Sequence, residues 1–408
     1  MAEQMKPSGI DWIGDIPKSW KVTRLQTLFD QVKDKNSGTK EKNLLSLSYG
    51  KIVKKDIEGA FGLIPESFDT YNIIKKNDIV LRLTDMQNDQ VSLRTGLVKE
   101  EKGIITSAYV TIRLKCGSPS YYHWYLYAFD TSKQIYAFGQ GVRQSLTFEE
   151  LKKMLILLPS PKEQQAIADF LDEECAQIDS IAADLEKQIA LLQQYKKSLV
   201  TETVTKGLDK SAPMKDSGVE WIGKIPEHWQ KTRIKFEASI IGSGTTPDSG
   251  NSMYYDNGEH SWIQSGDLYG KDYIYETEKQ LTNLAILECH ALNWYTKDFV
   301  VVAMYGASVG NVAISKIDSF TNQACCVIKL NEKNDNRYLF YFLKAAQEEM
   351  LLKAFGGTQP NISQIIIKNL NFLNVPLLEQ IEIADFLDSK CDICLLYTSP
   401  SPRDRSVS

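Results

Sequence analysis

Two stretches in the first half of the chain carry side chains that can hydrogen-bond the edges of nucleobases. Arginine offers two parallel donors that match guanine, and Asn or Gln matches adenine with one donor and one acceptor. Residues 81–96 (LRLTDMQNDQVSLRTG) and 138–146 (FGQGVRQSL) are dense in such residue types. The candidates are Arg82, Thr84, Gln87, Asn88, Gln90, Ser92 and Arg94 in the first stretch, and Gln140, Arg143 and Gln144 in the second.

The second half of the chain has comparable loops, which are rich in hydroxyl and amide groups rather than in cations. Hydroxyls and amides can contact both phosphates and base edges, so these loops also suit the reading of a DNA groove. For each single residue, a role in a solvated turn or a structural cap is an open alternative. The candidates are Ser243, Thr245, Thr246, Tyr305, Ser308, Asn311, Thr358, Gln359 and Asn361.

The sequence lacks the motifs of common catalytic sites. It contains no GxxxxGK[ST] phosphate loop, no GxGxxG and no HExxH. The four histidines are scattered, and the CxxC pair Cys391 and Cys394 has no second pair to complete a four-ligand metal site. We therefore expect neither a catalytic residue nor a metal or cofactor in this chain.

Composition and charge set the class of protein. Seven cysteines at irregular spacing argue against a disulfide framework and favour a reducing cytoplasm. No apolar stretch approaches the roughly 18 residues of a membrane span, so we expect no membrane association. The net charge of -5 is uneven, because residues 1–160 hold 23 Lys and Arg against 18 Asp and Glu, a balance of +5. Phosphate contacts depend on where cations cluster rather than on the total charge.

An internal repeat must position these loops. Residues 5–25 and 214–234, at an offset of 209, share 12 of 21 positions, including a tryptophan pair, Trp20 and Trp229. A second echo, EQQAIADFLDEEC at 163–175 against EQIEIADFLDSKC at 379–391, closes each copy. Identical edges around dissimilar interiors indicate a duplicated frame that presents two different surfaces. Retention of a duplication for stability alone is the alternative.

One long helix is predicted between the two copies. Residues 162–205 contain neither Gly nor Pro, and apolar residues recur every seven positions over four heptads, a pattern typical of a coiled coil. A helix of about 40 residues is roughly 60 Å long, which exceeds the needs of packing in a small domain. Docking of this helix on its own domain is the alternative. The seam consists of Leu171, Ile178, Leu185, Leu192 and Leu199.

Each copy otherwise predicts a mixed α/β domain. Short β-branched runs at 77–83 and 108–114 precede a helical pattern at 121–138, and runs at 260–264, 298–306, 311–317 and 324–330 precede one at 337–354. The end of the chain, residues 394–408 (CLLYTSPSPRDRSVS), breaks the pattern of a second long helix and resembles a translated sequencing adapter. We therefore expect the second helix to stop at 393, which would leave much of the seam uncovered, and exclude 394–408 from the fold.

The duplicated frame, the EQxxIAxFLD entry to each long helix, and the GVRQSL and GGTQPNIS loops before it resemble the DNA specificity subunit of type I restriction-modification enzymes. The resemblance covers residues 8–393. It implies an α+β fold with two target-recognition domains, at 1–159 and 217–375. Long helices follow them at 160–206 and, truncated, at 376–393, and a linker occupies 207–216. In the intact family the two helices form an antiparallel coiled coil.

The resemblance also implies the partners. The chain would bind double-stranded DNA, reading one half of a split, asymmetric target with each domain. It would assemble with two modification subunits, which methylate adenine using S-adenosylmethionine, and with restriction subunits that use ATP and Mg to translocate and cleave DNA.

Two other functions are open at this point. Aromatic residues in the second half could stack sugars, which would make the chain a carbohydrate- or peptide-binding scaffold. A nuclease in its own right would need an acidic metal cluster that the sequence does not display. The aromatic set is Tyr254, Tyr255, Trp262, Tyr269, Tyr273, Tyr275, Trp294 and Tyr295.

Overall fold

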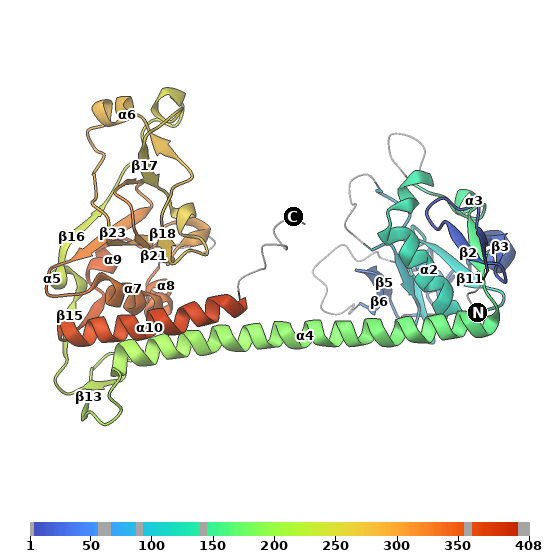
Figure 1. Cartoon of the computed structure of the whole chain (residues 1–408), viewed down its shortest axis with the longest axis horizontal. Coiled ribbons are helices and arrows are strands. Elements are labelled where there is room, and N and C mark those ends of the chain that lie inside the picture. The colour runs from blue at the N-terminus through green and yellow to red at the C-terminus, as the bar shows by residue number, and fades with distance from the viewer. Residues whose placement is uncertain (1–3, 56–66, 87–92, 139–144, 355–360, 399–408) are drawn as a thin grey trace. The chain divides into compact units, whose positions relative to one another are not determined.

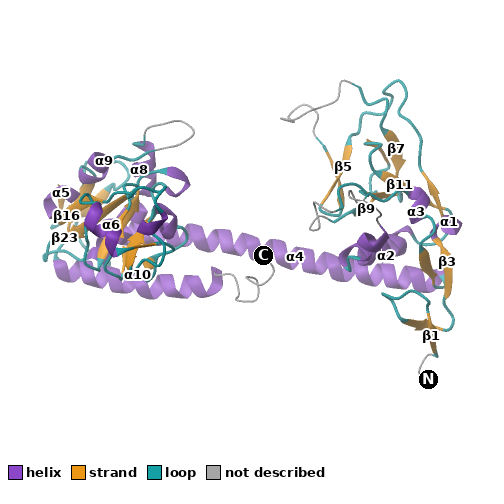
Figure 2. Cartoon of the chain, turned by 90° about the horizontal axis from the view of Figure 1, so that it is seen from above, coloured by secondary structure: helices purple, strands orange, loops and turns teal. Residues whose placement is uncertain are grey.

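The computed structural model describes residues 4–55, 67–86, 93–138, 145–354 and 361–398. The chain divides into two compact units, Met1–Ala182 and Ala183–Ser408. The long helix α4 (Pro161–Lys206) gives its first part to one unit and its last part to the other (Figure 1). Both units mix strands and helices, which confirms the expected α+β class (Figure 2).

Unit 1 is built around a four-stranded sheet in the order β4-β11-β8-β9, with all pairs antiparallel. Three two-stranded sheets flank it, β1-β2, β12-β3 and β10-β7, and a fourth is the hairpin β5-β6. Its elements are β1 (Met5–Pro7), β2 (Asp15–Pro17), β3 (Lys21–Arg24), α1 (Leu25–Leu28), β4 (Phe29–Gln31), β5 (Leu45–Ser48), β6 (Lys51–Lys54), β7 (Asn72–Lys75), β8 (Ile79–Leu81), β9 (Thr95–Leu97), β10 (Lys102–Ile105), β11 (Val110–Leu114), α2 (Pro119–Thr131), η1 (Gln134–Phe138), α3 (Phe148–Leu151) and β12 (Leu155–Leu158).

Unit 2 repeats this plan with one more strand in its main sheet. Its sheet has the order β16-β23-β20-β21-β18, and β15-β24 and β13-β14 correspond to β12-β3 and β1-β2. A three-stranded sheet, β19-β17-β22, is added. Its elements are β13 (Met214–Asp216), β14 (Lys224–Pro226), β15 (Gln230–Arg233), α5 (Ile234–Glu237), β16 (Ala238–Ser243), η2 (Ser252–Tyr254), β17 (His260–Ile263), η3 (Ser265–Leu268), β18 (Tyr273–Ile274), β19 (Gln280–Leu281), α6 (Asn283–Glu288), β20 (Phe299–Ala303), η4 (Gly306–Ser308), β21 (Val312–Ser315), β22 (Phe320–Thr321), β23 (Cys325–Leu330), α7 (Asn336–Ala345), α8 (Gln347–Leu352), α9 (Gln364–Lys368), β24 (Asn371–Asn374) and α10 (Leu377–Thr398).

The central strands and one helix form the core of each unit. All five residues of β20 are buried, as a strand covered on both faces requires. In unit 1, α2 buries Tyr121, Tyr122, Tyr125 and Phe129 in one cluster with Leu81 and Ile112 of the sheet. In unit 2, α7 buries six consecutive residues, Tyr338 to Leu343, and thus packs on all sides. The helical pattern expected at 337–354 forms two helices, α7 and α8, which meet at Ala346.

Local chemistry sets both ends of α4. The backbone N–H of Ser160 donates to Glu163 at 3.0 Å, and the N–H of Glu163 donates to the Ser160 hydroxyl at 3.3 Å, a reciprocal capping box. At the other end Gly207 adopts φ +73°, and its N–H donates to the Thr203 carbonyl at 3.0 Å. A left-handed residue at this position is the usual stop signal of a helix and favours glycine.

The predicted seam of α4 is only partly covered. Leu199 packs against the core of unit 2, whereas Ile178 and Leu185 are 62% and 53% exposed. Leu171 and Leu192 are half-buried. In unit 2, α10 lies beside the last turns of α4 (Figures 1 and 2), and its residues share a buried cluster with Val200 and Val204.

Helix α10 is longer than the sequence suggested. It continues to Thr398, past residue 393, so the expectation that the helical pattern breaks at Cys394 is wrong. The segment 394–398 contains neither Gly nor Pro, and the first proline of this region is Pro400. A residue that precedes proline is disfavoured in helical geometry, which is consistent with the observed end.

We predict that Tyr338→Phe destabilises unit 2. The fully buried Tyr338 hydroxyl donates to the Val204 carbonyl at 3.0 Å, in the last turn of α4, where carbonyls lack helical partners. Loss of a buried partner costs about 1–3 kcal/mol in the free energy of unfolding. Chemical denaturation of the full chain would measure it. The control Tyr49→Phe removes a hydroxyl from a side chain that is 83% exposed and should change stability by less than about 0.5 kcal/mol. Equal effects of the two variants would contradict the assignment.

Candidate nucleic-acid interface

In unit 2 the sheet register brings several distant loops to one end. Strand β16 ends at Ser243 opposite Cys326, and β20 ends at Ala303 opposite Cys325. Strand β21 begins at Val312 opposite Val302. The loops after β16, after β20 and before β23 therefore lie at the same end of the sheet. These loops carry the predicted residues Ser243, Thr245, Thr246, Tyr305, Ser308 and Asn311.

Backbone and side-chain hydrogen bonds hold further loops at this end of the sheet. The N–H of Ile362 donates to the Met304 carbonyl at 2.9 Å, which places Asn361 beside the loop after β20. The N–H of Asn322 donates to the Ile263 carbonyl at 2.9 Å. Thr246 also donates its hydroxyl to the Gln323 side chain. The structure thus gathers seven of the predicted residues into one loop cluster.

The glycines of the GSGTT segment serve close packing rather than a phosphate cradle. A Cβ at Gly244 would lie 1.6 Å from the Thr321 carbonyl oxygen, and one at Gly242 would lie 2.4 Å from the Tyr295 hydroxyl. That hydroxyl donates to the Ser243 carbonyl at 3.2 Å, and burial raises its pKa, so it remains a donor. These contacts fix where β16 ends and its loop begins.

A polar groove of about 600 Å³ opens next to this cluster. Thr246 lines it together with polar residues that the sequence analysis did not select, among them Asn257, Gln264, Lys279 and Gln280. Of these, Gln264 follows the end of β17 directly, so a search for polar residues at strand ends would have found it. The others come from segments whose proximity is visible only in three dimensions.

Exposure separates the predicted residues of unit 2. Thr246 and Asn361 are exposed, and Tyr305 is 39% exposed. Ser243, Thr245 and Asn311 are half-buried. Ser308 is buried in η4, so the expectation that its side chain contacts DNA does not fit this conformation.

Unit 1 repeats the arrangement. Leu81 at the end of β8 pairs with Thr95 of β9 and with Val110 of β11. The N–H of Leu146 donates to the Leu83 carbonyl at 2.9 Å, the counterpart of the Ile362 to Met304 bond in unit 2. The described ends of the two predicted loops of unit 1 therefore also meet at one end of the sheet. Arg82 and Thr84 are half-buried there.

Several predicted contacts fall outside the described residues. They are Gln87, Asn88, Gln90, Ser92, Gln140, Arg143, Gln144, Thr358 and Gln359.

Arg94 is buried and stabilises its own loop, so the expectation that its side chain contacts a base does not fit the structure. Its side chain has no exposed surface, and its guanidinium donates to the carbonyls of Thr84 at 2.8 Å, Arg82 at 3.2 Å and Asp85 at 3.2 Å. Its backbone N–H donates to Asp130 of α2 at 2.6 Å. A forked donor is suited to several carbonyls at once, so Arg94 binds the two ends of its own loop together.

The described residues show neither a metal-binding cluster nor a membrane-spanning helix. Within these ranges no group of three or more His, Cys, Asp or Glu is placed to hold a metal ion. None of the helices in the same ranges combines the length and apolar character that a membrane span requires.

Known proteins are similar to this chain over most of its length. The family model for the type I restriction modification DNA specificity domain matches residues 17–191 and again residues 226–395. The chain is 24% identical over 401 residues to the putative type I restriction enzyme MjaX specificity subunit of Methanocaldococcus jannaschii, covering 93% of this chain and 89% of that protein. It is 24% identical over 387 residues to the MjaVIII specificity subunit of the same organism, covering 92% and 86%.

Two solved structures share the fold. One, described as the structural basis of complex assembly and conformational transition of the type I R-M system, gives a TM-score of 0.64 at 16% identity, covering 94% of this chain and 93% of that one. The HsdS subunit from Thermoanaerobacter tengcongensis gives 0.54 at 14% identity, covering 95% and 93%.

We predict that Arg94→Ala destabilises unit 1 by about 3 kcal/mol or more, because it leaves several carbonyls without their charged donor. Chemical denaturation of the full chain would measure the loss. The matched control is Arg24→Ala, which truncates an exposed arginine of β3 and should cost less than about 0.5 kcal/mol. If Arg94→Ala were as stable as Arg24→Ala, the structural role of Arg94 would be wrong.

Proposed function

The chain belongs to the family of type I restriction-modification DNA specificity domains and is a DNA-recognition subunit with two domains, and we propose that each domain reads one half of a split target. The reading surface of each domain is the loop cluster at one end of its sheet. The family match gives no support to the carbohydrate- or peptide-binding alternative. Part of the aromatic set on which that alternative depended is core, since Trp262 is 1% and Tyr295 is 7% exposed.

The observation that carries the proposal is the repeated tie between loops. The bonds from Leu146 to Leu83 and from Ile362 to Met304 join the same pair of loops in both units. The frame is shared, but the side chains that the loops present are different. Unit 1 offers the cation Arg82, whereas unit 2 offers hydroxyls and amides such as Thr246 and Asn361. Different side chains select different bases, so the split target should be asymmetric.

The two halves of the target should be separated by a fixed distance. Domains of one protein that read the same face of a duplex need half-sites about one helical turn, or 34 Å, apart, or at multiples of that distance. The affinity of both domains should fall with salt, because phosphate contacts release counterions.

Catalysis is proposed to occur on partner subunits. By family likeness, two modification subunits would bind S-adenosylmethionine and methylate adenine, and restriction subunits would use ATP and Mg to translocate and cleave DNA. The exposed seam residues Ile178 and Leu185 on α4 are apolar surface that partner helices could cover. In this assembly the chain itself selects the site and holds the enzymes on it.

Co-expression with the modification subunit from the same locus tests the proposal, with methyladenine mapped across the genome. We predict a split, asymmetric motif. The double variant Thr246→Ala, Gln264→Ala should change base preference in one half only, since each lost contact is worth about 1–3 kcal/mol of discrimination. The other half should be unchanged.

The control is Lys333→Ala, an exposed residue in the turn after β23, at the opposite end of the sheet from the loop cluster. It should leave both halves of the motif intact. A soluble complex with an active modification subunit that produced no new methylation would contradict the proposal. A double variant that altered both halves equally would contradict the assignment of one half-site to each domain.

A further inference from the structure

Both long helices hold their domains through matched hydrogen bonds. The indole N–H of Trp20 donates to Glu163 at 3.0 Å, and that of Trp229 donates to Glu379 at 2.9 Å. Each glutamate lies in the first turn of its helix, α4 or α10. These four residues belong to the sequence repeat, so the repeat encodes a contact between domain and helix.

A buried glutamine forms the second matched contact. The Gln164 side chain accepts from the backbone N–H of Ser118 at 3.0 Å, and that of Gln380 accepts from the N–H of Asp335 at 2.9 Å. Ser118 and Asp335 are the N-cap residues of α2 and α7. The long helix therefore binds the same point of the domain helix in each unit.

An aspartate two turns further along each long helix forms the third contact. In unit 1, Asp172 accepts from the Ser120 hydroxyl at 2.7 Å and from the Trp124 indole N–H at 2.8 Å, with one oxygen for each donor. Both donors lie on α2, two and six residues after its N-cap. Residues at this spacing are neighbours on one face of a helix.

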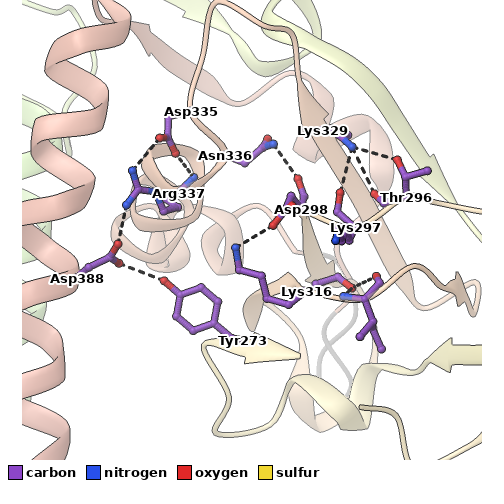
Figure 3. Close-up of polar contacts among 12 residues, drawn as sticks. Tyr273, Thr296, Lys297, Asp298, Lys316, Lys329, Asp335, Asn336, Arg337 and Asp388 are labelled. Carbon is purple, nitrogen blue, oxygen red and sulfur yellow. Dashed lines mark hydrogen bonds and ion pairs between the residues drawn. The ribbon is translucent and has the colours of Figure 1, made fainter. Parts of the chain in front are cut away.

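Unit 2 places donors at the same two positions of α7. Asp388 accepts from Arg337 at 2.9 Å and from the Tyr341 hydroxyl at 2.6 Å, and these donors lie two and six residues after the N-cap Asp335. Tyr273 of β18 adds a third bond to Asp388 at 3.1 Å (Figure 3). The geometry is thus kept although every donor differs in chemical type.

The two contacts differ in charge. Ser120 and Trp124 are neutral donors, whereas Arg337 is a cation that also bonds Asp385 at 2.7 Å and Asp335 at 3.1 Å. Partial burial opposes the charge of Arg337, but the bonds to Asp385 and Asp335 outweigh that effect and raise its pKa. Burial and the bond to Asp388 also raise the pKa of Tyr341, so its hydroxyl remains a donor.

Stability alone does not account for the contact of Asp172. Asp172 is exposed, and hydrogen bonds at exposed sites contribute little to the free energy of unfolding. The glutamine contact fixes one point of the domain helix on the long helix. The aspartate adds a contact to the domain helix about two turns further along the long helix, so it opposes rotation about the glutamine.

We propose that Asp172 and Asp388 are positioning residues that fix the orientation of each domain on its long helix and thereby restrict the spacing of the two half-sites. The inference rests on the proposed function, since it assumes that each domain reads one half of a split target. Rotation of a domain about its helix displaces its loop cluster along the duplex. The aspartates therefore act on the spacer between the half-sites and leave the identity of the bases to the loops.

The test uses the full chain in complex with its modification subunit. Methylation is measured on a library of duplexes that keep both half-sites and vary the spacer by one base pair in either direction. We expect Asp172→Ala and Asp388→Ala to lower the preference for the native spacer by about tenfold, the equivalent of one hydrogen bond to a charged group. The bases read in each half should be those of the unmodified protein.

The matched control is Asp169→Ala. Asp169 lies one turn earlier on α4 and bonds only within that helix, to Gln165 at 2.6 Å, among the contacts that the structure describes. It should keep the native spacer preference. Asp172→Asn preserves the shape of the side chain. Its amide oxygen can still accept one of the two hydrogen bonds, but its amide N–H group would face the other donor. The loss of spacer preference should therefore be intermediate. This variant also serves if the alanine variant fails to fold.

The spacer library gives results that support the proposal or overturn it. A relaxed spacer with unchanged bases supports the proposal. A spacer preference as sharp as that of the unmodified protein in both folded aspartate variants overturns it, and so does a change in base identity, which would place the aspartates on the reading surface.

Failure of the proposed function would be seen differently, as absence of any split motif for the unmodified protein. The contact itself would then be judged by hydrogen exchange at the backbone amides of the first turns of α2. Unchanged exchange in Asp172→Ala would overturn the role of Asp172, and faster exchange relative to Asp169→Ala would support it.

Discussion

Each domain depends on a buried glutamine at the start of its long helix. Gln164 is 1% exposed and Gln380 has no exposed surface. Each accepts from the N-cap amide of the domain helix and donates to a strand-end carbonyl, Pro159 at 3.0 Å or Val375 at 2.7 Å. A buried amide or carbonyl without a partner costs as much as several surface contacts contribute. The glutamine therefore sets where sheet, domain helix and long helix can meet.

The frame fixes where the loops lie but not which side chains they carry, and we assign the selection of bases to those side chains. The sheet register determines where each loop begins, and one backbone bond, Leu146 to Leu83 or Ile362 to Met304, determines which two loops meet. Neither constraint depends on the side chains that the loops present. A family of proteins built in this way can change specificity through loop substitutions without changing how the domain attaches to its helix. The matched donors to Asp172 and Asp388 show that attachment can be kept even when the donors themselves are exchanged.

The sequence was sufficient to predict the features that follow from periodicity and repetition. The repeat, the long helix and the position of β20 depend on local pattern, and the structure has them close to the expected bounds. The end of α10 lies beyond the expected bound, because a change of composition alone does not end a helix and the segment 394–398 contains no helix breaker.

Side-chain roles in the loops were harder to predict. Arg94 resembled a base contact by residue type, but its three carbonyl acceptors are assembled only by the folded loop. Asn257 and Lys279 joined the candidate surface only through tertiary structure, because the sheet brings together strands that are distant in sequence.

The most direct test of the central claim is photo-crosslinking of the assembled complex to its own methylated motif, with 5-iodouracil placed in one half-site at a time and the linked peptides identified by mass spectrometry. If each domain reads one half, one half-site should link to the loop cluster of unit 1 and the other to that of unit 2. Links from a single half-site to both clusters, or to surfaces outside them, would contradict the account.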